Sequence, residues 1–110
     1  MIAPLMAKQS GKPIAKPHRK DPVVRAAFAR ILVDRRMRLH LKQHEVASKS
    51  GYSEKYIGHL ERRINTPSLT AVIEISAALE MDPQEILTQV LLLMPRFKRL
   101  ERPDPEAADV

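Results

Sequence analysis

Cysteine is absent from this 110-residue chain, so the sequence contains neither a disulfide framework nor a thiolate zinc site. It also lacks any run of about eighteen apolar residues of the kind that spans a membrane. The apolar run within MIAPLMAKQSGKP is shorter than that of a secretory signal. We therefore expect a soluble cytoplasmic protein that does not act at a membrane.

The signatures of common enzyme sites are missing as well. There is no glycine-rich phosphate loop, and no serine or cysteine nucleophile stands beside a recognisable base. His40 and His44 have the spacing of two metal ligands on one helix, but the helix expected here begins at Gln43, which leaves His40 in a turn. A chain of this length holds one domain at most. We expect no enzymatic activity, no cofactor and no bound metal.

Positive charge is in excess, because 19 Lys and Arg residues stand against 13 Asp and Glu and give a net charge of +6. This balance favours an anionic partner such as nucleic acid. Most of the excess lies in residues 1–22, which also contain four of the nine prolines. Two interpretations of this flexible basic arm stay open: it keeps the chain soluble, or it lies along a phosphate backbone. Its cations are Lys8, Lys12, Lys16, Arg19 and Lys20.

Apolar residues recur with a helical period through residues 23–94, and no alternating pattern predicts a strand. The spacing predicts one all-α domain over this region, followed by a mobile tail at 95–110. Five helices are expected, at about 23–39, 43–50, 54–62, 69–79 and 83–94. The fourth helix is expected to bury Leu69, Val72, Ile73, Ile75 and Leu79.

The second and third helices carry local signals that fix how they meet. Gly51 is suited to the left-handed turn that ends one helix, and Ser53 offers a hydroxyl to cap the next. Ala47 is small enough for a close crossing, and Ile57 fills the angle between the helices. Two short helices joined by a short turn that contains glycine are the arrangement in which one helix supports another in the major groove of DNA.

The segment 31–87 resembles the helix-turn-helix domains of the Cro and phage-repressor type, the XRE-like family. The residues that carry the resemblance are Gln43, Glu45-Val46-Ala47, Gly51, Ser53, Ile57, Glu61 and Pro67-Ser68-Leu69. It implies a compact five-helix, lambda-repressor-like domain. The implied function is a sequence-specific transcriptional regulator, expected to be a repressor, that reads a palindromic operator in double-stranded DNA through its third helix.

The resemblance also implies an ion pair between Arg36 and Glu61, a contact that the sequence alone does not show. Three positions where the family usually has glycine hold other residues here: His40, Arg63 and Glu80. A left-handed residue other than glycine costs about 1 kcal/mol, so these departures affect loops more than the fold. Lys42 stands where the family usually has a capping serine or threonine.

Helical geometry separates the residues expected to meet DNA into two sets. Bases are expected to be read by Glu54, Lys55, Tyr56 and His59. Phosphates are expected to be bound by Gln43, Ser53, Arg62, Arg63 and Asn65, with Gln43 assigned from the resemblance. Gly58, placed on or near the outward face, either lets DNA approach or is a tolerated weak helix former.

The fifth helix has more apolar residues than a helix needs to cover one side of a small domain. We expect Ile86, Leu87, Val90 and Leu91 to face the core, and the surplus to form a homodimer interface at Leu92, Leu93 and Met94. The alternative is that the surplus packs beneath Phe97 and Leu100, or beneath the first helix. A second reading of the whole chain is the antitoxin of a toxin-antitoxin pair, which binds a toxin protein and its own operator.

Overall fold

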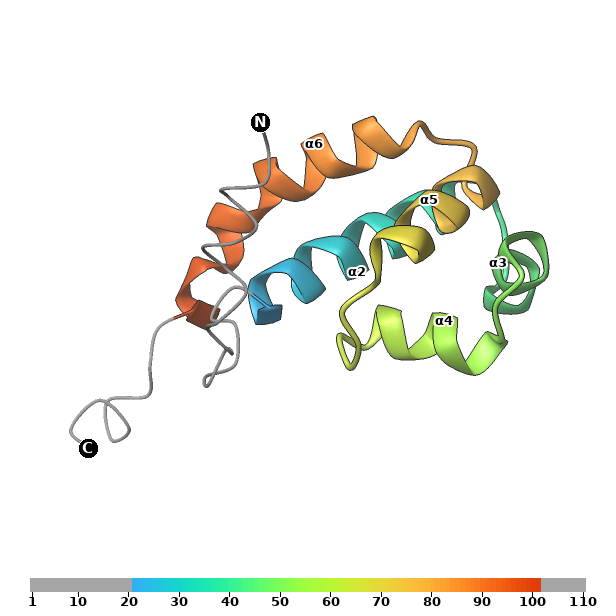
Figure 1. Cartoon of the computed structure of the whole chain (residues 1–110), viewed down its shortest axis with the longest axis horizontal. Helices are drawn as coiled ribbons and strands as arrows, with labels where there is room; N and C mark the ends of the chain where they lie inside the picture. Colours follow the sequence, from blue (N-terminus) through green and yellow to red (C-terminus); the bar gives the residue numbers. More distant parts are fainter. Residues whose placement is uncertain (1–20, 102–110) are drawn as a thin grey trace, which may run out of the picture.

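The computed structural model describes residues 21–101, which form helices and no strand (Figure 1). The elements are α2 (Asp21–Arg38), α3 (Gln43–Ser50), α4 (Glu54–Glu61), α5 (Leu69–Ala78), α6 (Pro83–Leu93) and the 3₁₀ helix η1 (Met94–Glu101). The all-α class and the five α-helices expected from the sequence are confirmed. The basic residues expected to form an arm, Lys8 to Lys20, lie outside the described residues.

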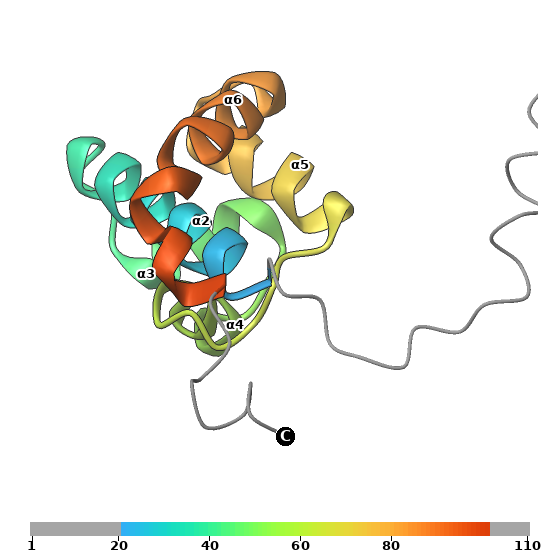
Figure 2. The ribbon, with the colours of Figure 1, turned by 90° about the vertical axis from the view of Figure 1, so that its left-hand side faces the viewer.

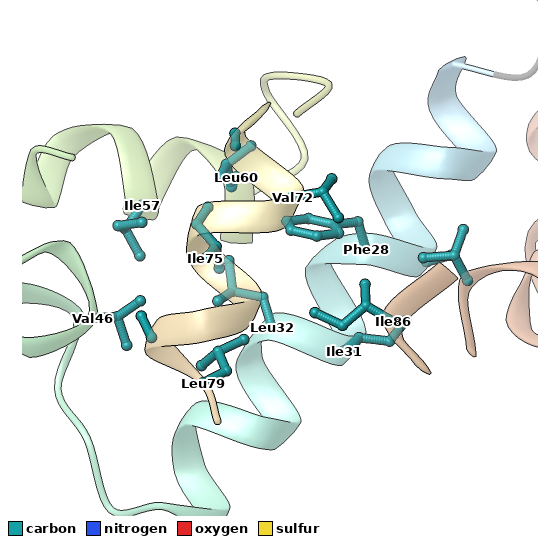
Figure 3. Packing of buried hydrophobic residues seen from close by; sticks show 14 of the residues in the cluster. Phe28, Ile31, Leu32, Val46, Ile57, Leu60, Val72, Ile75, Leu79 and Ile86 are labelled. Carbon is teal, nitrogen blue, oxygen red and sulfur yellow. The ribbon is translucent and has the colours of Figure 1, made fainter. Parts of the chain in front are cut away.

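The longest helix, α2, runs through the middle of the fold, with α6 on one side and α4 on the other (Figures 1 and 2). It is buried on several sides because alanines alternate with large apolar residues, which lets neighbouring helices approach closely. Phe28 and Leu32 of α2 meet Ile57 and Leu60 of α4 and Ile75 of α5 in one core (Figure 3). The core therefore fixes α4 directly against α2.

The helix ends follow the local signals in the sequence. Gly51 has a φ of 83°, and its N–H donates to the Ala47 carbonyl at 2.9 Å, which ends α3. The Ser53 and Ser68 hydroxyls accept hydrogen bonds from backbone N–H groups in the first turns of α4 and α5, each at 3.0 Å. Asp82 caps α6 in the same way at 2.9 Å. These caps confirm the expected starts of all three helices.

Two of the five residues expected to be buried on α5 are exposed. The buried side of α5 is formed by Ala71, Val72, Ile75 and the residues that follow them at helical spacing. Leu69 and Ile73 point away from this side and are 68% and 49% exposed. The expectation was wrong for Ile73 because it adjoins Val72 in the sequence but lies about 100° further around the helix. Leu69, four residues before Ile73, lies on the same exposed side.

A similar correction applies to α6. Ile86 and Val90, four residues apart, are buried, whereas Leu87 and Leu91 are 47% and 68% exposed. Because each stands one position after a buried residue, helical geometry rotates both away from the core. The narrow buried side of α6 thus leaves a pair of leucines in solvent.

The segment after α6 continues as a 3₁₀ helix. Residues 95–101, expected to belong to a mobile tail, form most of η1, which packs against α2 and α6. Phe97 packs against the core, and so do Leu93 and Met94, which are only partly exposed. Of the three residues expected at a dimer interface, only Leu92 is largely exposed. For Leu93 and Met94 the structure agrees with the alternative interpretation, in which the surplus packs inside the chain.

Candidate nucleic-acid interface

The turn between α3 and α4 sets the angle at which α4 is presented. After Gly51 reverses the chain, the Tyr52 N–H also donates to the Ala47 carbonyl, at 3.1 Å. Val46 and Ala47 of α3 and Ile57 of α4 are buried beneath this turn. The inner sides of both helices are thereby fixed to the core, and the opposite side of α4 faces solvent.

Glu61, the last residue of α4, connects three helices through its carboxylate. Arg36 of α2 donates to both of its oxygens, from Nε at 2.6 Å and from Nη2 at 3.0 Å. Gln43 of α3 donates to Oε1 at 2.8 Å. Arg36 also donates from Nη1 to the Leu41 carbonyl at 3.0 Å, and the Glu61 side chain is only 7% exposed. This largely buried network fixes the C-terminal end of α4 against α2 and α3.

Gly58 lies beneath two of the residues expected to bind phosphate. A Cβ at this position would stand 3.3 Å from Arg62 Nη1 and 3.6 Å from Gln43 Oε1. Gly58 is buried beneath these side chains, although helical spacing predicted a position on or near the outward face. Its missing side chain leaves room for the Gln43 amide and the Arg62 guanidinium to lie close together over the helix. Neither interpretation offered from the sequence included this packing, which involves two helices at once.

The four residues expected to read bases differ in exposure. Glu54 and Lys55 are exposed near the N-terminus of α4, while Tyr56 and His59 are partly buried. Tyr56 packs against the core with its ring centroid 4.9 Å from that of Tyr52, and burial raises its pKa. The structure therefore leaves Glu54 and Lys55 as the most accessible members of the set.

Tyr52 has a role that was not predicted from the sequence. Its hydroxyl donates to Glu74 Oε1 of α5 at 2.6 Å. The hydrogen bond to this carboxylate favours the protonated phenol and raises the pKa of Tyr52 to about 12. The contact joins the turn before α4 to α5. No local sequence signal marks it, because the two residues belong to separate elements.

The remaining residues expected to bind phosphate flank α4. Ser53 is exposed at its N-terminus, Arg62 and Arg63 are exposed just beyond its C-terminus, and Asn65 is partly buried in the following loop. Arg63 has a φ of 65° and its guanidinium carbon lies 5.1 Å from the centroid of the Phe97 ring of η1. No local sequence signal marks this cation–π contact, because its two residues belong to separate elements.

Comparison with known proteins identifies the arrangement. Residues 32–86, half of the chain, match the helix-turn-helix family of the Cro and phage-repressor type. No curated protein and no solved structure matched the chain. Within residues 21–101, no helix has both the length and the apolar character needed to cross a membrane. The chain belongs to this helix-turn-helix family, whose members are DNA-binding transcription regulators.

Proposed function

We propose that this protein is a sequence-specific repressor that places α4 in the major groove of a palindromic operator. The observation that carries the proposal is the contrast between the two sides of α4. Its inner side is fixed by Ile57, Leu60 and the Glu61 network, whereas Glu54 and Lys55 stand exposed on the other side. A rigid helix with exposed polar side chains is what base reading in the groove requires.

The chemistry of these side chains suits base edges. Lys55 donates to O6 and N7 of guanine, and Glu54 accepts from N4 of cytosine. His59 acts as donor or acceptor according to its tautomer. Tyr56, at the edge of this set, is placed to contact a phosphate or the methyl group of thymine.

Phosphate contacts at both ends of α4 hold the helix in register. Gln43 uses one amide N–H for Glu61 and has a second available for a phosphate oxygen. Ser53 lies at the N-terminal end, and Arg62, Arg63 and Asn65 continue beyond the C-terminal end. Because Gln43 and Arg62 both lie over Gly58, one phosphate can be reached from both side chains.

A palindromic operator requires two copies of α4 related by a two-fold axis. The exposed leucines of α6, namely Leu87, Leu91 and Leu92, form the apolar surface that we assign to a homodimer. Such a dimer places its recognition helices about 34 Å apart, on successive major grooves of one face of the duplex. A dimer bound across a promoter represses by occupying it.

The test is selection of bound duplexes from a random DNA pool by the full chain. We expect an inverted repeat whose half-site centres lie about one helical turn apart. A pool that is not enriched in any sequence would contradict sequence-specific binding. Enrichment of a lone half-site would contradict the dimer and leave base reading by α4 intact.

The second candidate function is an antitoxin that binds a toxin protein as well as its own operator. The observation that favours it is a further pair of exposed apolar residues, Leu69 and Ile73, on α5 rather than α6. This pair is separate from the leucines assigned to the dimer. We expect an adjoining small reading frame whose product forms a complex with the chain. The substitution Ile73→Glu should disrupt this complex. A complex unaffected by this substitution would contradict the assignment of α5.

A further inference from the structure

We propose that η1 is a second phosphate-binding element, which extends the contact with DNA beyond the helix-turn-helix unit. The inference rests on the proposed function, because it assumes that α4 docks in the groove. Its cations, the η1 strip, are Arg96, Lys98 and Arg99. The segment that carries them lies outside the family match at residues 32–86.

Packing fixes the position of η1 relative to α4. Phe97 is partly buried against the core, and η1 packs along α2 and α6. Figure 1 shows η1 beside the start of α2, and in Figure 2 η1 lies in front of α2, between α6 above and α4 below. η1 is thus attached to the rigid domain along α2, and the contact of Phe97 with Arg63 connects it to the C-terminal end of α4.

The contact between Arg63 and Phe97 connects the strip to the expected phosphate track. The guanidinium carbon of Arg63 lies 5.1 Å from the ring centroid. An arginine stacked on a ring keeps its N–H donors in the guanidinium plane, where they can still reach a phosphate. Stacking also restricts the side chain before DNA arrives, which lowers the entropy cost of binding. Phe97 is therefore a positioning residue for Arg63.

The charges on the strip are available to an anion. Arg96, Lys98 and Arg99 are exposed, and these three cations outnumber the one acidic residue of η1, Glu101 at its end. Both ion pairs found among the described side chains lie elsewhere, at Arg30–Asp34 and Arg36–Glu61. Because Arg63 lies over the Phe97 ring, the cations that flank Phe97 are brought near Arg63 at the C-terminal end of α4. Such a cluster of cations suits the phosphates of a DNA backbone.

The experiment neutralises the strip in the full chain with the triple variant Arg96→Gln, Lys98→Gln, Arg99→Gln. Affinity is measured at several salt concentrations for the selected operator and for a random duplex. The slope of log affinity against log salt should flatten by about 0.9 for each phosphate that the variant no longer binds. The ratio of the two affinities should stay unchanged, since phosphate contacts do not distinguish sequences. The control is Arg38→Gln, which removes an exposed charge from the opposite end of α2 and should leave the slope nearly unchanged.

A second variant tests the role of Phe97. Phe97→Leu keeps an apolar side chain against the core and removes the ring, so the melting temperature should change little. The salt slope should still flatten by up to about 0.9, because Arg63 loses its support. Arg63→Ala should flatten the slope by the same amount, and combining both changes should add nothing.

The outcomes separate this inference from the proposed function. If the unmodified chain binds no DNA, both are overturned. If it binds its operator and the triple variant keeps the full salt slope, the η1 strip is only a solvated surface and this inference alone is overturned. A triple variant that loses preference for the operator at unchanged salt slope would also overturn it.

Discussion

The helices α4 and α6 differ in the kind of side that each exposes to solvent. On α4 the apolar residues Ile57 and Leu60 are buried, and the exposed side carries polar and charged residues. On α6 only Ile86 and Val90 are buried, and Leu87, Leu91 and Leu92 remain in solvent. Both helices are capped and packed on α2, so the difference lies in their exposed sides. The exposed side of α4 suits a polar, anionic ligand, whereas that of α6 suits an apolar partner.

The largest expected effect comes from breaking the attachment of α4. Glu61→Ala removes the carboxylate to which Arg36 and Gln43 donate, and strands the Arg36 charge, whose side chain is only 17% exposed. The free energy of unfolding should fall by about 3 to 5 kcal/mol. The control is Arg30→Ala, which breaks the exposed Arg30–Asp34 pair and should cost about 0 to 1 kcal/mol. If urea denaturation showed an equal decrease in the free energy of unfolding for both variants, the role given to Glu61 would be contradicted.

The next effect should appear on the exposed side of α6. Leu91→Glu places a charge in the proposed dimer interface, so the dimer dissociation constant should rise at least tenfold, or about 1.4 kcal/mol. Affinity for the palindrome should fall while a single half-site is still bound. Thr70→Glu, at an exposed position on α5, is the control with the same change of charge. Light scattering that shows the same dimer in both variants would move the interface away from α6.

A smaller effect distinguishes the turns that lead into these two helices. Gly51 precedes α4 with a φ of 83°, whereas Glu80 precedes α6 with a φ of 56°. Glu80→Gly should therefore stabilise the fold by about 0.5 to 1 kcal/mol, after allowing for the greater freedom of glycine in the unfolded chain. Gly51→Ala should destabilise it by about 1 kcal/mol, through the backbone alone, since a Cβ there meets no atom within 4 Å. Melting temperatures that shift in the same direction for both variants would refute this account of the turns.

The smallest effect concerns pH and the contact that joins the turn before α4 to α5. Because the folded pKa of Tyr52 is about 12 and the unfolded value is 10.0, the folded state holds this proton more tightly. The stability that results is fully present below pH 10 and is lost as pH rises toward 12. Tyr52→Phe should remove that part of the pH dependence, whereas Tyr56→Phe should leave it in place. A Tyr52 resonance that titrates near pH 10 in the folded protein would contradict the hydrogen bond to Glu74.

The sequence was most informative where the signals are local. The α3 bounds, the turn at Gly51 and the caps at Ser53 and Asp82 each depend on a few adjacent residues, and all were predictable. The ion pair of Arg36 with Glu61 was available only through the family resemblance, because 25 residues separate its partners.

Features that depend on several elements at once were not predictable. Gly58 is buried only because Gln43 and Arg62 arrive from either side. The charged, proline-containing segment of η1 has the composition of a tail, yet Phe97 anchors it to the core. The sequence indicated that α6 has more apolar residues than the core needs, but it did not indicate which of them are exposed. A rotation of one residue decides whether Leu91 or Leu93 is exposed, and periodicity alone does not resolve that step.

The central claim is that α4 reads bases while its flanks bind phosphates, and one comparison tests it most directly. Affinities of the unmodified chain, Lys55→Ala and Arg62→Ala are measured for the selected operator and for a random duplex at one salt concentration. Lys55→Ala should cost about 1 to 3 kcal/mol on the operator and little on random DNA, so the specificity ratio falls. Arg62→Ala should weaken both by a similar factor and keep the ratio. If Lys55→Ala weakened both duplexes equally, α4 would not be the base-reading helix in this register.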